Sequence, residues 1–293
     1  METYIVKPCG YCLGVNNAID LSLKVKKKYP SKNVYIFGML VHNNVVTDML
    51  QKEGIITLDT TTCSKKKRLQ EFTSEDIVIF TAHGHDEEYE AILKKNNVLY
   101  FDSTCPIVKK NISLIKEYLK TGDVIYIGKK NHPETEAALA VSSNIILYDI
   151  KEGFDVNLVK KDQIHVVNQT TLSFLELEDI HKDIINHFPS AIIEDEICGA
   201  TRVRQTRIAS LNEDFDLFVI IGSLKSSNTD KLFQIAKEKY PSSLVLKVET
   251  KEELKKYDLS KCKKACLASG TSTPLSINSS ILLKKNSSKY SKR

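Results

Sequence analysis

The chain has 293 residues, of which 42% are hydrophobic and 27% are charged, the composition of an ordinary globular protein. No apolar run approaches the ~18 residues that a membrane-spanning helix needs. The net charge is +5, but five basic residues lie in the last ten positions, and the rest of the chain balances at 37 basic against 37 acidic side chains. We therefore expect no nucleic-acid partner and no membrane partner, and we interpret the Lys/Ser-rich segment 284–293 as a disordered basic tail.

Cysteine usage indicates the compartment. The number of cysteines is odd, and the N-terminus lacks the basic and apolar segments of a secretory signal. These features argue against a disulfide framework and predict a cytoplasmic protein, whose cysteines act as thiolates or as small core residues. The seven cysteines are Cys9, Cys12, Cys63, Cys105, Cys198, Cys262 and Cys266.

Three of these cysteines are equally spaced, with 93 residues from Cys12 to Cys105 and again from Cys105 to Cys198. A short apolar run predicts a strand before each of them, and apolar residues at helical spacing predict a helix after each. A second strand then leads into a polar loop and another helix, and a third strand ends in small polar residues. The strands are expected at 4–6, 98–101 and 191–193, then at 34–38, 124–128 and 217–222, and finally just before 81–84, 169–173 and 270–274.

Strands that alternate with helices predict parallel sheets, so the sequence predicts an α/β fold of three similar units. The expected divisions are a first unit at 14–104, a second at 105–197, and a third that combines 1–13 with 198–283. The cysteines and the polar loops fall at the carboxyl ends of strands, the edge where parallel sheets bind ligands. If the three units meet around a pseudo-threefold axis, as a trefoil, these loops converge on one central site.

Three convergent thiolates suit an iron–sulfur cluster. Each cysteine precedes a helix, whose N-terminus stabilises a thiolate, and Pro106 is typical of a first helical position. A 4Fe-4S cluster with three cysteine ligands keeps one iron open to a substrate oxygen. Zinc is the alternative metal, although structural zinc usually takes closely spaced cysteine pairs. A thioredoxin-like pair at Cys9 and Cys12 is a further alternative, but it explains neither Cys105 nor Cys198.

The polar loops offer hydrogen-bond donors close to helix starts, where anions bind, so they predict a phosphate or diphosphate site. Glu134 stands out as a carboxylate in these loops, either as a proton donor to a leaving hydroxyl or as a helix cap. Cys9 is interpreted as a bystander, and Cys63, Cys262 and Cys266 as small residues in or near the core. The donors are His42, His83, His132, Thr170, Ser226, Ser227, Asn228 and Ser272.

The order of short motifs along the chain resembles that of the 4-hydroxy-3-methylbut-2-enyl diphosphate reductases. The similarity covers nearly the whole chain to about Ile281, and so many motifs in one order are highly specific. The matching segments are Gly10–Val15, Val41–Asn43, Ala82–Gly84, Thr104–Pro106, His132–Glu134, Gln169–Ser173, Ile197–Cys198, Ala200–Thr201, Arg204–Gln205, Ser226–Asn228 and Ser272–Pro274.

This resemblance implies one 4Fe-4S cluster per chain, held by Cys12, Cys105 and Cys198 at the centre of the trefoil. It implies a two-electron reductive dehydroxylation that yields isopentenyl and dimethylallyl diphosphates, the last step of the methylerythritol phosphate route to isoprenoids. Ferredoxin or flavodoxin would supply the electrons. Glu134 and Thr170 would lie near the substrate hydroxyl. The diphosphate pocket would be lined by His42, His83, His132, Ser226, Ser227, Asn228 and Ser272.

The chain departs from the family's usual pattern at three places, none of them a predicted cluster ligand. The stretch 81–86 reads Thr-Ala-His-Gly-His-Asp, Ser103 replaces an alanine, and Leu275 stands where an acid is common. Two rival functions remain open from the residues alone. One is a non-redox iron–sulfur dehydratase or synthase, and the other is a metal-binding or redox-sensing protein with no diphosphate site.

Overall fold

The computed structural model describes residues 1–61, 64–194, 197–276 and 281. The predicted tail at 284–293 and Cys63 lie outside these described residues. Residue contacts divide the chain into two compact parts, a large part from Leu13 to Cys198 and a small part that joins Met1–Cys12 to the segment from Gly199 onward.

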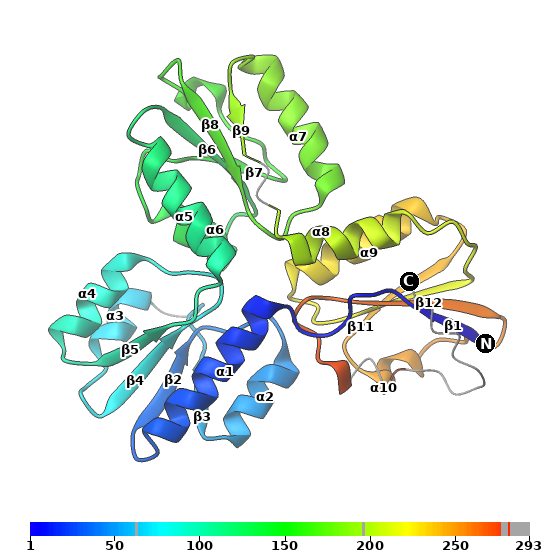
Figure 1. Ribbon diagram of the computed structural model, residues 1–293, viewed down its shortest axis with the longest axis horizontal. Coiled ribbons are helices and arrows are strands. Elements are labelled where there is room, and N and C mark those ends of the chain that lie inside the picture. Colours follow the sequence, from blue (N-terminus) through cyan, green and yellow to red (C-terminus); the bar gives the residue numbers. More distant parts are fainter. Residues whose placement is uncertain (62–63, 195–196, 277–280, 282–293) are drawn as a thin grey trace. The chain divides into compact units, whose positions relative to one another are not determined.

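The large part contains two four-stranded parallel sheets with helices on both faces (Figure 1). The strand orders are β3-β2-β4-β5 and β7-β6-β8-β9. The elements around the first sheet are α1 (Leu13–Lys28), β2 (Asn33–Phe37), α2 (Asn44–Lys52), β3 (Ile55–Leu58), α3 (Lys65–Gln70), β4 (Asp76–Phe80), α4 (Glu87–Lys95) and β5 (Leu99–Asp102). Those around the second are α5 (Pro106–Tyr118), β6 (Asp123–Gly128), α6 (Pro133–Leu139), β7 (Ile146–Asp149), a 3-10 turn (Val156–Leu158), β8 (Ile164–Asn168), α7 (Phe174–His187) and β9 (Ile192–Ile193).

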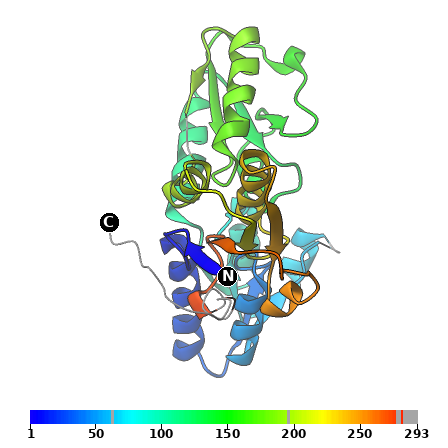
Figure 2. The same cartoon turned by 90° about the vertical axis from the view of Figure 1, so that its right-hand side faces the viewer.

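The small part contains one parallel sheet in the order β1-β12-β10-β11. Its edge strand β1 comes from the N-terminus and lies beside β12 (Figure 1 and Figure 2). In this pair Tyr4 of β1 lies opposite Cys266 of β12. The elements are β1 (Glu2–Ile5), α8 (Gly199–Ala209), β10 (Leu217–Ile221), α9 (Ser227–Lys239), β11 (Leu244–Val248), α10 (Lys251–Leu254) and β12 (Lys264–Ser269). Read from the other edge, this order is β11-β10-β12-β1. It matches the orders β3-β2-β4-β5 and β7-β6-β8-β9 of the large part strand for strand.

The central strands β6, β8 and β10 are buried along their whole length, because helices cover both faces of each parallel sheet. Ile125, Val166 and Leu177 are at most 2% exposed in the core of the second sheet, and burial of such a side chain contributes about 1.5–3 kcal/mol. The expected α/β fold with three parallel-sheet units is therefore confirmed. Among the helices that the structure describes, none has the length and apolar character needed to cross a membrane.

Candidate functional site

The three equally spaced cysteines occupy equivalent positions in the three sheets. Each is the residue directly before a helix, namely α1, α5 and α8. Each backbone N–H donates to the carbonyl of the second residue after the third strand of a repeat. These bonds run from Cys12 to Thr271, from Cys105 to Ala82 and from Cys198 to Thr170, with N···O distances of 2.9, 3.0 and 3.0 Å. The equal spacing in the sequence thus corresponds to one backbone hydrogen bond that is repeated three times, and we call this bond the backbone anchor of each cysteine.

The same cysteines have the chemistry that a metal cluster needs. Cys12, Cys105 and Cys198 form no disulfide within the described residues and are only partly buried, so their sulfur atoms can act as metal ligands. Cys266, by contrast, lies fully buried in β12, and Cys262 packs against the core of the same sheet, as expected for small core residues. Burial raises the pKa of both of these thiols, which disfavours the thiolate. The donor set at the three anchored cysteines therefore fits an iron–sulfur cluster.

The predicted histidines form a compact group in the large part. Ring centroids of His42 and His83 lie 4.4 Å apart, and those of His132 lie 5.5 and 5.7 Å from the other two. Burial, followed by repulsion from neighbouring histidines, holds the pKa of His83 well below its ordinary value and lowers that of His132 to about 3. At neutral pH His83 and His132 are consequently neutral rings that can each donate one N–H.

His132 also has a structural task that determines its tautomer. It is the N-cap of α6, and its Nδ1 accepts a hydrogen bond from the Glu134 backbone N–H at 3.2 Å. A neutral imidazole that accepts at Nδ1 carries its proton on Nε2. His132 therefore presents Nε2–H as a donor. The sequence argument missed this capping role, because Ser, Thr, Asp and Asn are the usual caps.

Glu134 is the second residue of α6, and its side chain is only 3% exposed. Its carboxylate accepts hydrogen bonds from the Thr170 backbone N–H at 2.7 Å and from Thr170 Oγ1 at 3.0 Å. Burial raises the pKa of Glu134 to about 7, although both bonds from Thr170 act in the opposite direction. Because His132 caps the helix, the Glu134 carboxyl group is not needed as the cap. Thr170 holds this carboxyl group in place, and its pKa lets it gain and lose a proton near neutral pH.

Gln169 is a supporting residue to which the sequence argument gave no role. It is fully buried, and its Oε1 accepts from the Lys129 backbone N–H and from Thr135 Oγ1 at 3.0 and 3.3 Å. These bonds connect the loop after β8 to the start of α6, and so they place Thr170 beside Glu134. A glutamine directly after a wholly buried strand was the signal in the sequence.

The remaining predicted donors lie together in the small part. Ser226 caps α9, and its Oγ accepts from the Thr229 backbone N–H at 3.3 Å. Ser227 and Asn228 are the first two residues of this helix, so their backbone N–H groups have no partner within it. A Cβ on Gly270 would lie 2.3 Å from Thr229 Oγ1 and 3.6 Å from Asn228 Nδ2, so the loop that carries Ser272 approaches the start of α9 closely.

Asn228 is the strongest sign of a ligand in the small part. Its side chain is 2% exposed, and neither its Oδ1 nor its Nδ2 has a hydrogen-bond partner within the described residues. A buried amide without partners costs about 1–3 kcal/mol of stability. Such a cost is expected where a polar ligand completes the hydrogen bonds, and the adjacent helix N-terminus favours an anion.

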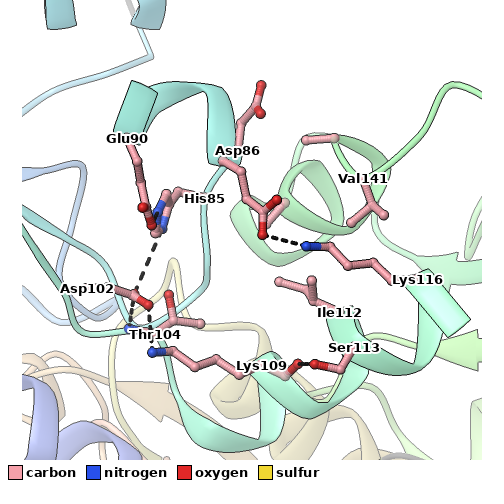
Figure 3. Close-up of a pocket in the computed structure, with 13 residues that line it drawn as sticks. His85, Asp86, Glu90, Asp102, Thr104, Lys109, Ile112, Ser113, Lys116 and Val141 are labelled. Atoms are coloured by element: carbon pink, nitrogen blue, oxygen red, sulfur yellow. Dashed lines mark hydrogen bonds and ion pairs between the residues drawn. The ribbon is translucent and has the colours of Figure 1, made fainter. Parts of the chain in front are cut away.

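A separate cavity of about 290 Å³ lies in the large part between the start of α4, helix α5 and the end of α6 (Figure 3). Here His85 stacks on Phe80, with ring centroids 3.7 Å apart, and its Nε2 lies 3.2 Å from Glu90 Oε1. Lys109 Nζ lies 2.6 Å from an oxygen of Asp102. The departures at 81–86 and at Ser103 thus fall beside this network, and the predicted site residues do not line the cavity.

Three repeated parallel α/β sheets, three equivalently anchored cysteines and a buried acid beside neutral histidines indicate an enzyme whose cysteines are chemically suited to a metal cluster. The LytB protein family profile matches residues 3–284, and the chain belongs to this family. Relatives from Geobacillus sp. (strain WCH70) and Bacillus cereus (strain AH187), both named 4-hydroxy-3-methylbut-2-enyl diphosphate reductase, are 35% and 36% identical, over 96% of this chain and 89% of theirs.

Solved structures agree with this assignment. The E-1-hydroxy-2-methyl-but-2-enyl-4-diphosphate reductase from Plasmodium falciparum is 28% identical, with a TM-score of 0.82 over 95% of this chain and 86% of that one. A structure of (E)-4-hydroxy-3-methyl-but-2-enyl diphosphate reductase, described as the terminal enzyme of the non-mevalonate pathway, is 27% identical, with a TM-score of 0.67 over 96% and 98% of the two chains. The expected family is therefore confirmed.

Proposed function

We propose that the chain catalyses the two-electron reductive dehydroxylation of (E)-4-hydroxy-3-methylbut-2-enyl diphosphate to isopentenyl and dimethylallyl diphosphates. The family membership and the names of the relatives support this reaction. The observation that carries the proposal is the backbone anchor repeated at Cys12, Cys105 and Cys198. A fold that anchors three thiols in the same way, 93 residues apart, is explained by one centre that uses all three.

These three cysteines would hold one 4Fe-4S cluster per chain, around which units 14–104, 105–197 and 1–13 with 198–283 pack as a trefoil. When bound, such a cluster supplies electrons and a Lewis-acidic iron for the substrate hydroxyl. The absence of a disulfide at all three positions, within the described residues, is consistent with this assignment. They also fit a reducing compartment, the cytoplasm, where ferredoxin or flavodoxin would serve as electron donor.

The diphosphate would be bound by neutral donors. His42, His83 and His132 offer ring N–H groups, and the start of α9 offers Ser226, Ser227 and Asn228, with Ser272 from the loop after β12. An anion near His83 and His132 favours their protonated forms, so substrate binding would raise their pKa values and draw protons into the site. Exclusion of water would strengthen each of these hydrogen bonds.

Glu134 would supply the proton that lets the hydroxyl leave as water. A pKa of about 7 lets it hold a proton at neutral pH and release it readily. Thr170 positions the carboxyl group through its backbone N–H and its hydroxyl, and the hydroxyl oxygen would accept a hydrogen bond from the substrate hydroxyl. Protonation of the resulting allylic carbon skeleton at either end accounts for two products.

The test is anaerobic purification, analysis of iron and sulfide, and assay of both products with a chemical reductant. Cys12→Ser, Cys105→Ser and Cys198→Ser should each lose most of the iron, whereas Cys9→Ser, a control in the same loop as Cys12, should retain it. Retention of iron by Cys105→Ser together with loss of iron by Cys9→Ser would overturn the ligand assignment. Turnover without any reductant would indicate a non-redox dehydratase, and failure to bind an allylic diphosphate would indicate a redox sensor.

A further inference from the structure

Arg204 of α8 connects the segments that carry two of the three anchored cysteines. Its side chain lies in the small part and is only 3% exposed. Its Nη2 donates to the Gly10 carbonyl at 2.8 Å, and its Nη1 donates to the Ala200 carbonyl at 2.9 Å. Gly10 is two residues before Cys12, and Ala200 is two residues after Cys198. The guanidinium therefore bonds to the chain close to both cysteines.

Three contacts hold the loop that carries Cys12, and one of them is the hydrogen bond from Arg204. Gly10 has a left-handed φ of +87°, and a Cβ at this position would lie 2.8 Å from Leu275 Cγ. The Cys12 N–H is bonded to the Thr271 carbonyl. Leu275, which replaces the family's common acid, thus packs over Gly10, while Arg204 holds the carbonyl of the same residue. Two residues span at most about 7 Å, so the guanidinium bonds to the chain within that length of the Cys12 backbone.

We infer that Arg204 is a positioning residue for the cluster, with two effects that rest on the proposed function. Its bonds to the Gly10 and Ala200 carbonyls hold the Cys12 loop and the first turn of α8 in the ligating geometry. Its permanent charge stabilises the reduced cluster, because reduction adds a negative charge to a centre that already has three thiolates.

Two variants separate these effects in the full-length, cluster-loaded protein. Arg204→Lys keeps the charge but loses the planar pair of donors, so iron release to a chelator should be at least tenfold faster while the reduction potential changes little. Arg204→Gln loses the charge as well, so the reduction equilibrium should also become about tenfold less favourable, which for one electron is about 59 mV lower. Arg207→Gln removes the same charge from an exposed position on the same helix, and it should match the wild type in both measurements.

Iron-release kinetics and potentiometric titration followed by electron paramagnetic resonance provide the readouts, with thermal unfolding of the apo-protein as a check on folding. A purely structural role predicts a lower unfolding temperature for the apo-protein, with the potential unchanged in Arg204→Gln, and this result would overturn the inference. If Arg204→Gln fails to fold, a wild-type rate of iron release in Arg204→Lys would overturn it instead. A wild-type protein that binds no cluster would refute the proposed function itself, before any variant is compared.

Discussion

The same position in two repeats holds an acid in one and an amide in the other. Glu134 and Asn228 are each the second residue of the helix after the first central strand, α6 and α9, and both are buried. Each precedes a threonine whose hydroxyl faces the glycine at the end of that strand, Thr135 against Gly128 and Thr229 against Gly222. The backbone is thus reused, and the side chain alone decides the chemistry.

The two side chains differ in their partners. Glu134 accepts two hydrogen bonds from Thr170, whereas Asn228 has none within the described residues. The acid is therefore held in place before any ligand arrives, as a proton donor should be, while the amide is left for a ligand to satisfy. In the proposed function, one of these helix starts serves proton transfer and the other serves anion binding, and exchanges at the two positions test this proposal.

The largest effect is expected when the acid is converted to the amide. Glu134→Gln keeps the shape and much of the hydrogen bonding of Glu134 but lacks the titratable proton. Because a positioned acid contributes about 10²–10⁴-fold to rate, turnover with a chemical reductant should fall by that factor while the cluster and substrate binding persist. Glu136→Gln, which removes an exposed acid of the same helix, is the matched control. Near-normal turnover of cluster-loaded Glu134→Gln would exclude Glu134 as the proton source.

The same substitution should stabilise the apo-protein at high pH. The native pKa of about 7 lies above the ordinary value of 4.5, so the native state binds more protons than the unfolded state between these values. The free energy of unfolding therefore falls by about 3 kcal/mol as the pH rises from 4.5 through 7. Denaturant unfolding of wild type and Glu134→Gln should give a difference of that order at pH 8 and a much smaller one at pH 4.5. An equal difference at both pH values would contradict the raised pKa.

The reverse exchange, Asn228→Asp, should impair substrate binding more than chemistry. A carboxylate at this position would face the bound diphosphate, and like charges in a buried site repel strongly. We expect KM to rise by about tenfold or more, with a smaller change in kcat, in steady-state assays at neutral pH. Asn144→Asp adds the same charge at an exposed turn and should leave KM unchanged. If Asn228→Asp had the KM of the wild type, Asn228 would not face the anion.

The smallest effect is expected in the Lys/Ser-rich segment 284–293. Deletion of residues 285–293 removes a segment with almost nothing to bury, so its ordering would cost conformational entropy without compensation. Unfolding midpoint and turnover with a chemical reductant should both stay within error of the full chain. A large loss of either would show that the tail contributes to the folded body.

The sequence by itself determined the fold class, because strands and helices recur in the period of each repeat and apolar runs mark strands buried on both faces. It also singled out Cys12, Cys105 and Cys198, since equal spacing is visible without any coordinates. It identified Glu134 as a candidate acid but left a helix-capping role open.

Only the tertiary structure shows which groups Glu134 contacts, because a cap and a proton donor at the same position differ in partners that are distant in sequence. His132 takes the cap, and Thr170, 36 residues further along the chain, holds the carboxylate in a site dry enough to raise its pKa. The role of Arg204 was equally invisible, since its bond to Gly10 spans 194 residues. Burial and hydrogen bonding between distant segments are properties of the packed chain, and no local pattern encodes them.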